Sequence, residues 1–268
     1  MPARGKRRAL GQHFLKDRRI TQLIADTSYE LAKHYGCKAM LEIGPGKGAI
    51  TEPLLKLLAD GTSQGHSIQF LLSEKDWELA HYWKNQNLRV EEGDFLDLPT
   101  DRWLVDRPLA IASNLPYSAG TAILTRLARH QDAIPFMVLM FQAEVAERLR
   151  AQPDTKAWGS LSIWIQNRWE VKKLCHVGPG AFSPPPEVES EVVILKAREK
   201  PLIAIQDEKL WEHLLKSAFA HRRKMLRSTF KGTPHFKEAL DASGIDGTKR
   251  AEALTWEEWE KLYQTAQR

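Results

Sequence analysis

The stretch AMLEIGPGKGAITEPLL, residues 39–55, joins an apolar run to a helix-like pattern through three closely spaced glycines. Residues 39–43 predict a buried strand, and residues 49–55 predict the start of a helix with apolar residues on one face. Glycines at such a turn permit the backbone to approach a ligand closely. The stretch therefore predicts an α/β fold with a ligand site where the strand meets the helix.

Glu42 distinguishes between two kinds of ligand at this turn. Gly44, Gly46 and Ala49 formally satisfy a dinucleotide-binding pattern, which would place a pyrophosphate at the helix N-terminus. A carboxylate directly before the turn repels a pyrophosphate, whereas it attracts a cationic amino-acid headgroup. The alternative for Glu42 is a solvated charge at the end of the strand.

Two more acidic residues follow strand-like runs farther along the chain. Residues 68–73 end at Glu74, and residues 88–93 end at Asp94 and Phe95. Because ligands of open α/β sheets bind outside the carboxyl ends of the strands, we expect these residues to converge. Glu74 is placed to hold ribose hydroxyls, and Asp94 to accept from an adenine amino group with Phe95 against the ring. The alternatives are helix-capping acids and a core phenylalanine.

A fourth apolar run, residues 109–113, predicts a strand that ends at the tetrapeptide Asn114-Leu115-Pro116-Tyr117. The amide oxygen of Asn114 and the carbonyl of Leu115 can accept both hydrogens of an exocyclic amine, which frees the lone pair of its nitrogen. Pro116 stiffens the turn, and Tyr117 offers an aromatic face to an extruded base. The alternative is an ordinary loop in which Asn114 or Ser118 caps a helix.

Six motifs then occur in the order found in one enzyme family. They are GQHFL (11–15), EIGPG (42–46), GDF (93–95), NLPY (114–117), FQAEVAERL (141–149) and FSPPPEVES (182–190). Through these motifs the chain resembles the ribosomal RNA adenine dimethyltransferases over nearly its whole length. The resemblance implies an S-adenosylmethionine-dependent enzyme that places two methyl groups on N6 of adjacent adenosines in small-subunit ribosomal RNA.

The resemblance also implies a role for each matching residue. It implies that His13 and Leu15 flank the cofactor adenosine, that Gly44 lies against the methionine part, and that Tyr117 and Phe182 sandwich the target base. The chain departs from the family pattern at His13, where the family often has Asn, and at residues 118–120. The predicted cofactor-binding residues are His13, Leu15, Glu42, Gly44, Gly46, Glu74, Asp94, Phe95 and Asn114, and the predicted catalytic residues are Asn114, Leu115, Pro116 and Tyr117.

The charge of the chain suits a polyanionic partner. The formal net charge is +5 and the sequence pI is about 9.1. Cations crowd the first nineteen residues, and a second cluster alternates with apolar residues over 222–230, which predicts an amphipathic helix with its cations outward. The alternatives are a solubilising tail and a solvated helix face. The predicted RNA-binding residues are Arg4, Lys6, Arg7, Arg8, Arg222, Arg223 and Lys224.

Alternating strand and helix patterns up to about Arg198 predict a doubly wound, Rossmann-like methyltransferase sheet, followed by a small all-helical C-terminal domain. We expect residues 1–198 to form the methyltransferase domain with a basic N-terminal arm, and residues 199–268 to contact RNA or the ribosome. Within the first domain, residues 59–67 are expected to form a surface loop and residues 171–177 and 188–195 a hairpin pair. The predicted C-terminal helices cover residues 208–220, 222–230, 235–243 and 255–266.

Cysteine usage and hydropathy limit the remaining possibilities. Cys37 and Cys175 have no metal-ligand spacing, so neither a metal site nor a disulfide is predicted. No apolar run approaches membrane-spanning length, and no secretory signal follows the basic N-terminus. We therefore expect a cytoplasmic, monomeric protein whose partner is small-subunit ribosomal RNA or an immature small ribosomal subunit.

Three other functions remain open at this point. Large-subunit ribosomal RNA methyltransferases that confer antibiotic resistance share the cofactor motifs, although the three prolines at 184–186 and the basic residues at 222–224 favour the small-subunit branch. A ribosome-assembly factor or nucleic-acid scaffold with a vestigial cofactor fold is a second possibility. A nicotinamide-dependent oxidoreductase is the third, and it rests on the glycine turn alone.

Overall fold

The computed structural model describes residues 13–268, which form two compact units. Unit 1 contains the residues up to Ala146 together with Glu170–Ala197, and unit 2 contains Glu147–Trp169 together with Arg198–Arg268. A division of the chain thus falls between residues 197 and 198, and the segment 147–169 joins the C-terminal helices.

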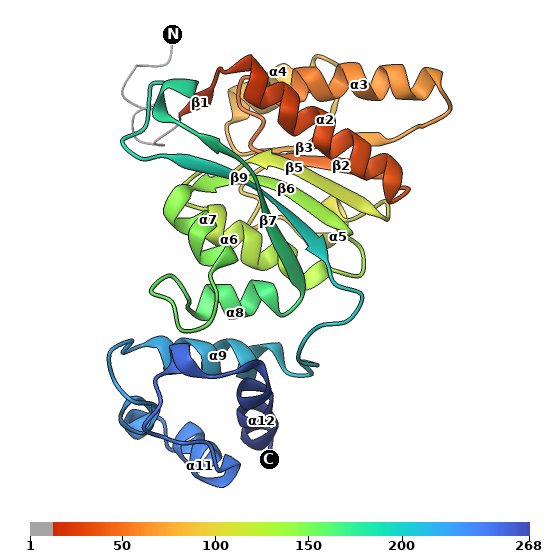
Figure 1. Ribbon diagram of the computed structural model, residues 1–268. Coiled ribbons are helices and arrows are strands. Elements are labelled where there is room, and N and C mark those ends of the chain that lie inside the picture. Colours follow the sequence, from red (N-terminus) through yellow and green to blue (C-terminus); the bar gives the residue numbers. More distant parts are fainter. Residues whose placement is uncertain (1–12) are drawn as a thin grey trace. The chain divides into compact units, whose positions relative to one another are not determined.

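A seven-stranded sheet forms the centre of unit 1 (Figure 1). The pairs β2–β3, β2–β5, β3–β4 and β5–β6 are parallel, whereas β6 and β9 are antiparallel. Every residue of β2 is buried, as expected for a strand covered on both faces. The strand order is β4 (Arg89–Glu92), β3 (Gln69–Glu74), β2 (Ala39–Ile43), β5 (Leu109–Asn114), β6 (Phe136–Gln142), β9 (Ser190–Ala197) and β7 (Trp169–Val177).

Helices cover both faces of this sheet, with α2 and α3 on one face and α6 and α7 on the other (Figure 1). This arrangement confirms the predicted doubly wound fold. Asp17 starts the first long helix, because its side chain accepts hydrogen bonds from the N–H groups of Arg19 and Ile20. The helices of unit 1 are α2 (Arg18–His34), α3 (Thr51–Ser63), α4 (Trp77–Lys84), α5 (Thr100–Trp103) and α6 (Gly120–Leu127), with a short 3-10 turn, η1 (Ala128–His130), after α6. Helix α7 (Ala143–Arg150) begins in unit 1 and ends in unit 2.

The strand order reverses beside β2. The chain proceeds outward from β2 through β3 to β4, and then returns to form β5 on the other side of β2. Such a reversal is a topological switch point, where the loops at the carboxyl ends of two neighbouring strands diverge and leave a crevice. The fold therefore places the ligand crevice of unit 1 beside the ends of β2 and β5.

A second sheet of two short strands joins distant parts of unit 1. Strand β1 (Phe14–Leu15) pairs antiparallel with β8 (Phe182–Ser183), which follows a 3-10 turn, η2 (Pro179–Ala181). The N–H group of Lys16 donates to the carbonyl of Ala181 at 2.8 Å and extends the pairing. The sequence pattern did not predict these strands, because two residues are too few to show a period.

Unit 2 consists of short helices around an aromatic core. Trp211 of α9 contacts Trp259 and Tyr263 of α12, with ring centroids 6.1 and 5.5 Å apart. Thr255 and Glu258 form the predicted capping box at the start of α12. The helices are α8 (Ser160–Gln166), α9 (Glu208–Phe219), α10 (Leu226–Thr229), α11 (Pro234–Ser243) and α12 (Trp256–Ala266), with 3-10 turns η3 (Phe230–Gly232) and η4 (Ala251–Ala253).

The helix predicted over residues 222–230 is wrong in its first part. Residues 221–224 form a turn in which the N–H group of Lys224 donates to the carbonyl of His221, and α10 starts only at Leu226. The side chain of Arg222 donates to the carbonyls of Lys156 and Trp158, at 2.6 and 2.8 Å. These bonds hold Arg222 against the preceding loop of unit 2 and do not leave it on an outward helix face.

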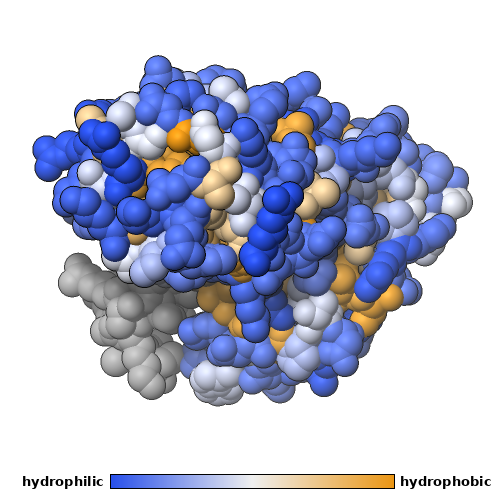
Figure 2. Space-filling model, turned by 90° about the horizontal axis from the view of Figure 1, so that it is seen from below, coloured by the Kyte–Doolittle hydropathy of each residue, from blue (hydrophilic) through white to orange (hydrophobic). Residues whose placement is uncertain are grey.

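The face of the molecule in Figure 2 is mostly hydrophilic, with small hydrophobic areas between the polar side chains. Large apolar residues that remain exposed include Trp77 and Tyr82 on α4. Scattered exposure of this kind is ordinary for folded proteins. Within the described part of the chain, no helix combines the length and the apolar character that a membrane crossing requires.

Candidate active site at the strand ends

Four neighbouring parallel strands bring their carboxyl ends to one edge of the sheet. Glu74 and Asn114 are the last residues of β3 and β5, and Gly44 and Asp94 follow the ends of β2 and β4. The structure therefore brings together the strand-end residues that the sequence predicts to converge. A Cβ atom placed on Gly44 would lie 3.9 Å from Cδ of Pro116, so the glycine turn and the tetrapeptide are in contact.

The glycine turn has the backbone shape that requires glycine. Gly46 and Gly48 have φ angles of 55° and 88°, a region that residues with a side chain rarely adopt. The N–H group of Gly44 donates to the carbonyl of Ser73 at 2.8 Å, which ties the turn to β3. The ring of Phe14 lies 3.2 Å from where a Gly46 Cβ would be. Larger residues at these positions would block the close approach of a ligand.

Glu42 is buried beneath this turn and is not a solvated charge at a strand end. Its side chain accepts a hydrogen bond from Oγ1 of Thr51 at 2.8 Å, and only 2% of the residue is exposed. The pKa of Glu42 is raised to about 8: burial is the largest cause, the bond from Thr51 acts against it, and the nearby carboxyl of Glu74 adds a smaller rise. A buried carboxyl of this kind gains much from a cation placed beside it.

Glu74 contacts both the glycine turn and the start of the next helix. Its Oε2 accepts from the N–H of Gly46 at 3.1 Å, and its Oε1 accepts from the N–H of Asp76 at 2.9 Å. Burial raises the pKa of Glu74, and these backbone bonds act against that rise. Each carboxylate oxygen keeps acceptor capacity beyond one bond. Glu74 can therefore also accept from two neighbouring hydroxyls such as those of a ribose.

Asp94 is held as a charged acceptor at the end of β4. Nζ of Lys75 lies 2.7 Å from its Oδ2, and the N–H of Leu96 donates to its Oδ1 at 3.0 Å. The hydrogen bond from Lys75, followed by that from Leu96, lowers the pKa of Asp94. An ionised carboxylate accepts hydrogen bonds and donates none, which suits recognition of an amino group.

An arginine that the sequence pattern did not predict holds the turn after Asp94 in place. The guanidinium of Arg126 on α6 donates to the carbonyls of Phe95 and Leu98. It also lies over the rings of Phe95 and Trp103, 5.1 and 5.6 Å from their centroids. Phe95 itself is buried, so its ring forms a wall under the turn. An isolated arginine within a helix pattern gives no signal of such a role.

Asn114 presents its amide at the switch point. The hydroxyl of Ser113 donates to the carbonyl of Ile43 at 2.5 Å and fixes the end of β5 against β2. Leu115 is buried, and the carbonyl of Pro116 accepts from the N–H of Gly120 at 2.8 Å at the start of α6. Among the described residues, no side chain or backbone group forms a hydrogen bond with the Asn114 amide. The backbone on either side of Asn114 is thus fixed, and the side-chain amide keeps its hydrogen-bonding capacity for a ligand.

Tyr117 is joined to two other segments of unit 1. Its hydroxyl lies 2.5 Å from Oγ of Ser190 on β9, and its ring stacks on that of His13 with centroids 5.9 Å apart. Burial raises the pKa of Tyr117, so the hydroxyl stays protonated at neutral pH. Nδ1 of His13 in turn lies 2.9 Å from the carbonyl of Pro184. These contacts set the tilt of the Tyr117 ring.

Phe182 occupies a different environment from the open sandwich expected beside Tyr117. Only 1% of the residue is exposed, and it packs in the hydrophobic core of unit 1 with Leu15, its partner across the β1·β8 pair. Stacking of Phe182 on a target base stays a prediction, and it requires the ring to leave this core. The predicted RNA-binding residues Arg4, Lys6, Arg7 and Arg8 lie outside the described residues.

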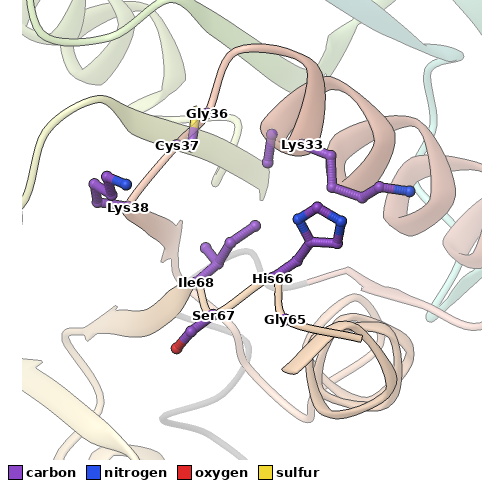
Figure 3. A pocket seen from close by; sticks show the side chains of 9 residues that line it. Lys33, Gly36, Cys37, Lys38, Gly65, His66, Ser67 and Ile68 are labelled. Atoms are coloured by element: carbon purple, nitrogen blue, oxygen red, sulfur yellow. The ribbon is translucent and has the colours of Figure 1, made fainter. Parts of the chain in front are cut away.

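A cavity in unit 1 lies away from this edge. Its walls are the segments that lead into β2 and β3, so it is at the amino ends of these strands. Figure 3 shows His66 and Ile68 beside the last turns of α2, with the side chain of Lys38 pointing away from them. Burial raises the pKa of the Cys37 thiol in its wall to about 12, which makes that thiol unreactive. The candidate site is therefore the edge at the carboxyl ends.

The groups at that edge fit S-adenosylmethionine, the cofactor that the family resemblance implies. A buried carboxyl (Glu42) suits a cationic headgroup, and a glycine turn permits close approach of the chain. Glu74 offers acceptors for a ribose diol, and Asp94 offers one for an adenine amino group. The carboxyls of Glu42, Glu74 and Asp94 disfavour a pyrophosphate at this edge, although the glycine turn alone could accept one.

Comparison with known proteins identifies the family of the chain. The family model described as "Ribosomal RNA adenine dimethylase" matches residues 3–268. The protein "Ribosomal RNA small subunit methyltransferase A" of Syntrophotalea carbinolica is 36% identical over 272 residues, which cover 100% of this chain and 98% of that protein. The protein of the same name from Ruegeria sp. is 39% identical, covering 94% of this chain and 89% of that protein.

Solved structures show the same fold. A dimethyladenosine transferase from Plasmodium falciparum matches with a TM-score of 0.70 and 24% identity, over 93% of this chain and 96% of that one. The 23S rRNA methyltransferase ErmE matches with a TM-score of 0.62 and 22% identity, over 95% of this chain and 100% of that one. The two-part chain, sheet and helical segment together, is thus a known architecture.

Proposed function

The chain belongs to the ribosomal RNA adenine dimethylase family, and from this premise we propose that it methylates N6 of two adjacent adenosines in small-subunit ribosomal RNA during ribosome assembly. The enzyme uses S-adenosylmethionine. The observation that carries the proposal is the shared edge of the parallel strands, where Glu74 ends β3, Asn114 ends β5 and Asp94 follows β4. This edge offers hydrogen-bond acceptors both to a nucleoside cofactor and to the amino group of a target base.

We assign the cofactor to the half of the edge between β2 and β4. Glu42 lies nearest the cationic headgroup, Gly44 and Gly46 line the methionine part, Glu74 holds the ribose and Asp94 the adenine amino group. When bound, S-adenosylmethionine supplies an electrophilic methyl group on a sulfonium centre. Catalysis by the protein then depends mainly on orientation, because a well-placed nucleophile needs little further help against so reactive a donor.

Asn114 and Leu115 activate the target amine in this proposal. The amide oxygen and the neighbouring carbonyl accept the two hydrogens of N6, so the lone pair of that nitrogen leaves conjugation with the ring and points toward the methyl group. Pro116 keeps the two acceptors in a fixed relation. The alkylated amine is far more acidic than its parent and gives its proton to water, so no strong base is required.

Tyr117 holds the flipped adenine by stacking, with His13 and Ser190 fixing its ring. Phe182 is proposed to contact the other face of the base after rearrangement of the β1·β8 pair, which now buries it. Leu15 lies opposite Phe182 on the partner strand β1 and is proposed to contact the cofactor adenosine. The two-stranded sheet is thus proposed to close over the bound base.

The remaining assignments concern RNA and the cell. We propose that residues 1–198 carry the chemistry and that residues 199–268 contact RNA in an immature small subunit. Arg223 and Lys224 are exposed in unit 2 and suit phosphate contacts, whereas Arg222 supports the fold of that unit. The basic N-terminal residues are proposed to contribute in the same way. The enzyme is proposed to act as a monomer in the cytoplasm.

One experiment tests the reaction directly. The protein is incubated with methyl-labelled S-adenosylmethionine and small subunits from cells that lack the modification, and labelled nucleotides are then mapped. Two adjacent dimethyladenosines in small-subunit RNA are expected. Label only in large-subunit RNA would move the enzyme to the other branch of the family, and no label in RNA would favour an assembly scaffold.

A further inference from the structure

Helix α4 is bound at both of its ends to the predicted cofactor edge. At its start, the N–H of Asp76 donates to Oε1 of Glu74 at 2.9 Å, and the Asp76 side chain caps the helix. In its last turn, Nε1 of Trp83 donates to the carbonyl of Gly46 at 3.0 Å. The same short helix therefore contacts the ribose-holding carboxylate and the glycine turn.

The peptide groups of Gly46 are consequently held on two sides by side chains. The N–H of Gly46 donates to Glu74, and its carbonyl accepts from Trp83. A glycine with a φ of 55° has no side chain of its own to restrict rotation. The two bonds replace that restriction and set the direction in which the turn presents its backbone.

The indole ring of Trp83 also fixes the turn by contact. A Cβ atom on Gly48 would lie 2.5 Å from Cη2 and 2.7 Å from Cζ2 of Trp83, so the ring rests directly on the backbone of Gly48. Trp83 is 3% exposed and has little room to move. The ring thus packs against the backbone of the turn at Gly48, and its N–H group is hydrogen-bonded to the turn at Gly46.

We infer that Trp83 is a positioning residue for S-adenosylmethionine: it does not touch the cofactor but holds the Gly46 peptide so that Glu74 meets the ribose in one geometry. The inference rests on the proposed function, because it concerns the cofactor of that same site. Without the indole N–H, the carbonyl of Gly46 loses its partner, and the adjoining peptide can rotate. The Gly46 N–H then turns away from Glu74, and the carboxylate loses the bond that aims it.

A purely structural role predicts something different. If Trp83 only fills space, then its replacement destabilises the protein without a specific loss of cofactor affinity. Trp211 provides the matched control, since it is fully buried in unit 2 and its Nε1 has no hydrogen-bond partner among the described residues. Trp211→Phe removes the same atoms from a core that is remote in sequence from the cofactor edge.

The test measures binding of S-adenosylhomocysteine by calorimetry to the wild type, Trp83→Phe and Trp211→Phe. We expect about a tenfold higher Kd for Trp83→Phe, which corresponds to about 1.4 kcal/mol, and an unchanged Kd for Trp211→Phe. For methylation of small subunits, KM for S-adenosylmethionine should rise likewise while kcat at saturation changes less than about twofold. An unchanged Kd in a folded Trp83→Phe protein would overturn the inference while leaving the proposed function intact.

Wild-type protein that binds no S-adenosylhomocysteine would instead overturn the proposed function, and this inference with it. If Trp83→Phe does not fold, hydrogen exchange of the Trp83 indole N–H in the wild type provides the second measurement. Because the cofactor would clamp the turn from its open side, exchange of this N–H is expected to slow at least about tenfold on binding. Equal exchange rates with and without the ligand would contradict a positioning role.

Discussion

The hydroxyl groups of Tyr117 and Ser190 lie 2.5 Å apart, although the two residues are 73 positions apart in the chain. The bond joins the tetrapeptide at the end of β5 to the first residue of β9, two strands away in the sheet. It therefore couples the ring that is proposed to stack on the target base to the rigid sheet of unit 1.

Loss of this bond should affect the RNA substrate and not the cofactor. Ser190→Ala and Tyr117→Phe each remove it, and each is expected to reduce kcat/KM for small subunits about five- to tenfold, which corresponds to about 1 kcal/mol. The double variant should lose no more than either single one, because both remove the same bond. Additive losses in that cycle would mean that the two hydroxyls act separately. Affinity for S-adenosylhomocysteine serves as the control and should stay the same.

Asn114→Ala should nearly abolish methyl transfer while leaving cofactor binding measurable. The truncated side chain can no longer accept a hydrogen of the target amine, so its nitrogen keeps its lone pair in the ring. Single-turnover labelling of small subunits measures the rate. The exposed neighbour Ser118 offers a matched control, and Ser118→Ala should retain the wild-type rate. Near-normal turnover by Asn114→Ala would reject the assigned role.

The raised pKa of Glu42, about 8, predicts that cofactor affinity depends on pH. The protonated form predominates below pH 8, and a cationic headgroup favours the ionised form. Affinity for S-adenosylmethionine should therefore rise with pH up to about 8, by up to about tenfold per unit. Glu42→Gln keeps the shape of the side chain and should remove this dependence. A wild-type affinity that does not change between pH 6 and 8 would contradict the prediction.

Glu42 also makes the free energy of unfolding depend on pH, in the direction opposite to that of cofactor affinity. In the unfolded chain Glu42 has the ordinary glutamate pKa of 4.5, so between pH 4.5 and 8 the folded protein binds more protons at Glu42 than the unfolded chain does. The stabilisation that the folded protein gains from the proton on Glu42 is fully present below about pH 4.5 and is lost as pH rises through 8. Relative to the wild type, Glu42→Gln should therefore become more stable as pH is raised across this window. Urea unfolding of both proteins at several pH values measures the difference.

Arg126→Met should loosen the turn that follows Asp94. Two carbonyls, those of Phe95 and Leu98, would lose their donor, and we expect the free energy of unfolding to fall by about 2–3 kcal/mol. By contrast, Lys237→Met removes an ion pair with the exposed Asp241 and should cost less than about 0.5 kcal/mol. Chemical denaturation compares the two variants. Similar losses in both would show that Arg126 contributes no more than an ordinary surface charge.

Neighbouring arginines in unit 2 should respond differently to substitution. Arg222→Ala removes the donor to Lys156 and Trp158 and should destabilise the protein by about 1–2 kcal/mol. Arg223→Ala should leave stability unchanged and weaken RNA binding. The slope of log K against log salt concentration should become shallower by about 0.9, the value for one lost phosphate contact. Binding to small-subunit RNA at several salt concentrations distinguishes them. An unchanged salt slope for Arg223→Ala would remove that residue from the RNA contact.

The sequence predicted the sheet well because its central strands are uninterrupted apolar runs. Residues 39–43 and 109–113 form β2 and β5 within one residue of the predicted bounds. The loop expected at residues 59–67 was wrong in its first half, since α3 continues to Ser63. Gly61 lies within this helix, and only glycine fits there because a Cβ would come within 2.0 Å of the Tyr29 hydroxyl. A glycine that makes room for a neighbouring helix looks the same in a sequence as one that ends a helix.

The sequence predicted the site residues that lie at strand ends, but it did not predict the residues in helices that hold the turns of the site in place. Glu74, Asp94 and Asn114 stand directly after apolar runs, so topology alone brings them together. Trp83 and Arg126 lie inside helices and act through backbone carbonyls that no sequence pattern marks. Contacts of this kind depend on the packing of helices against loops, which a periodicity does not describe.

The contact between Trp83 and Gly48 restricts the routes by which this protein can evolve. A side chain at position 48 would overlap the indole, so that position cannot diversify while the tryptophan is present. A smaller ring at position 83 would remove this overlap first, and a side chain at position 48 would then meet only the strain of a φ of 88°. A substitution of Trp83 must therefore precede one of Gly48. In a library that randomises position 48 alone, only glycine should be found among the active variants.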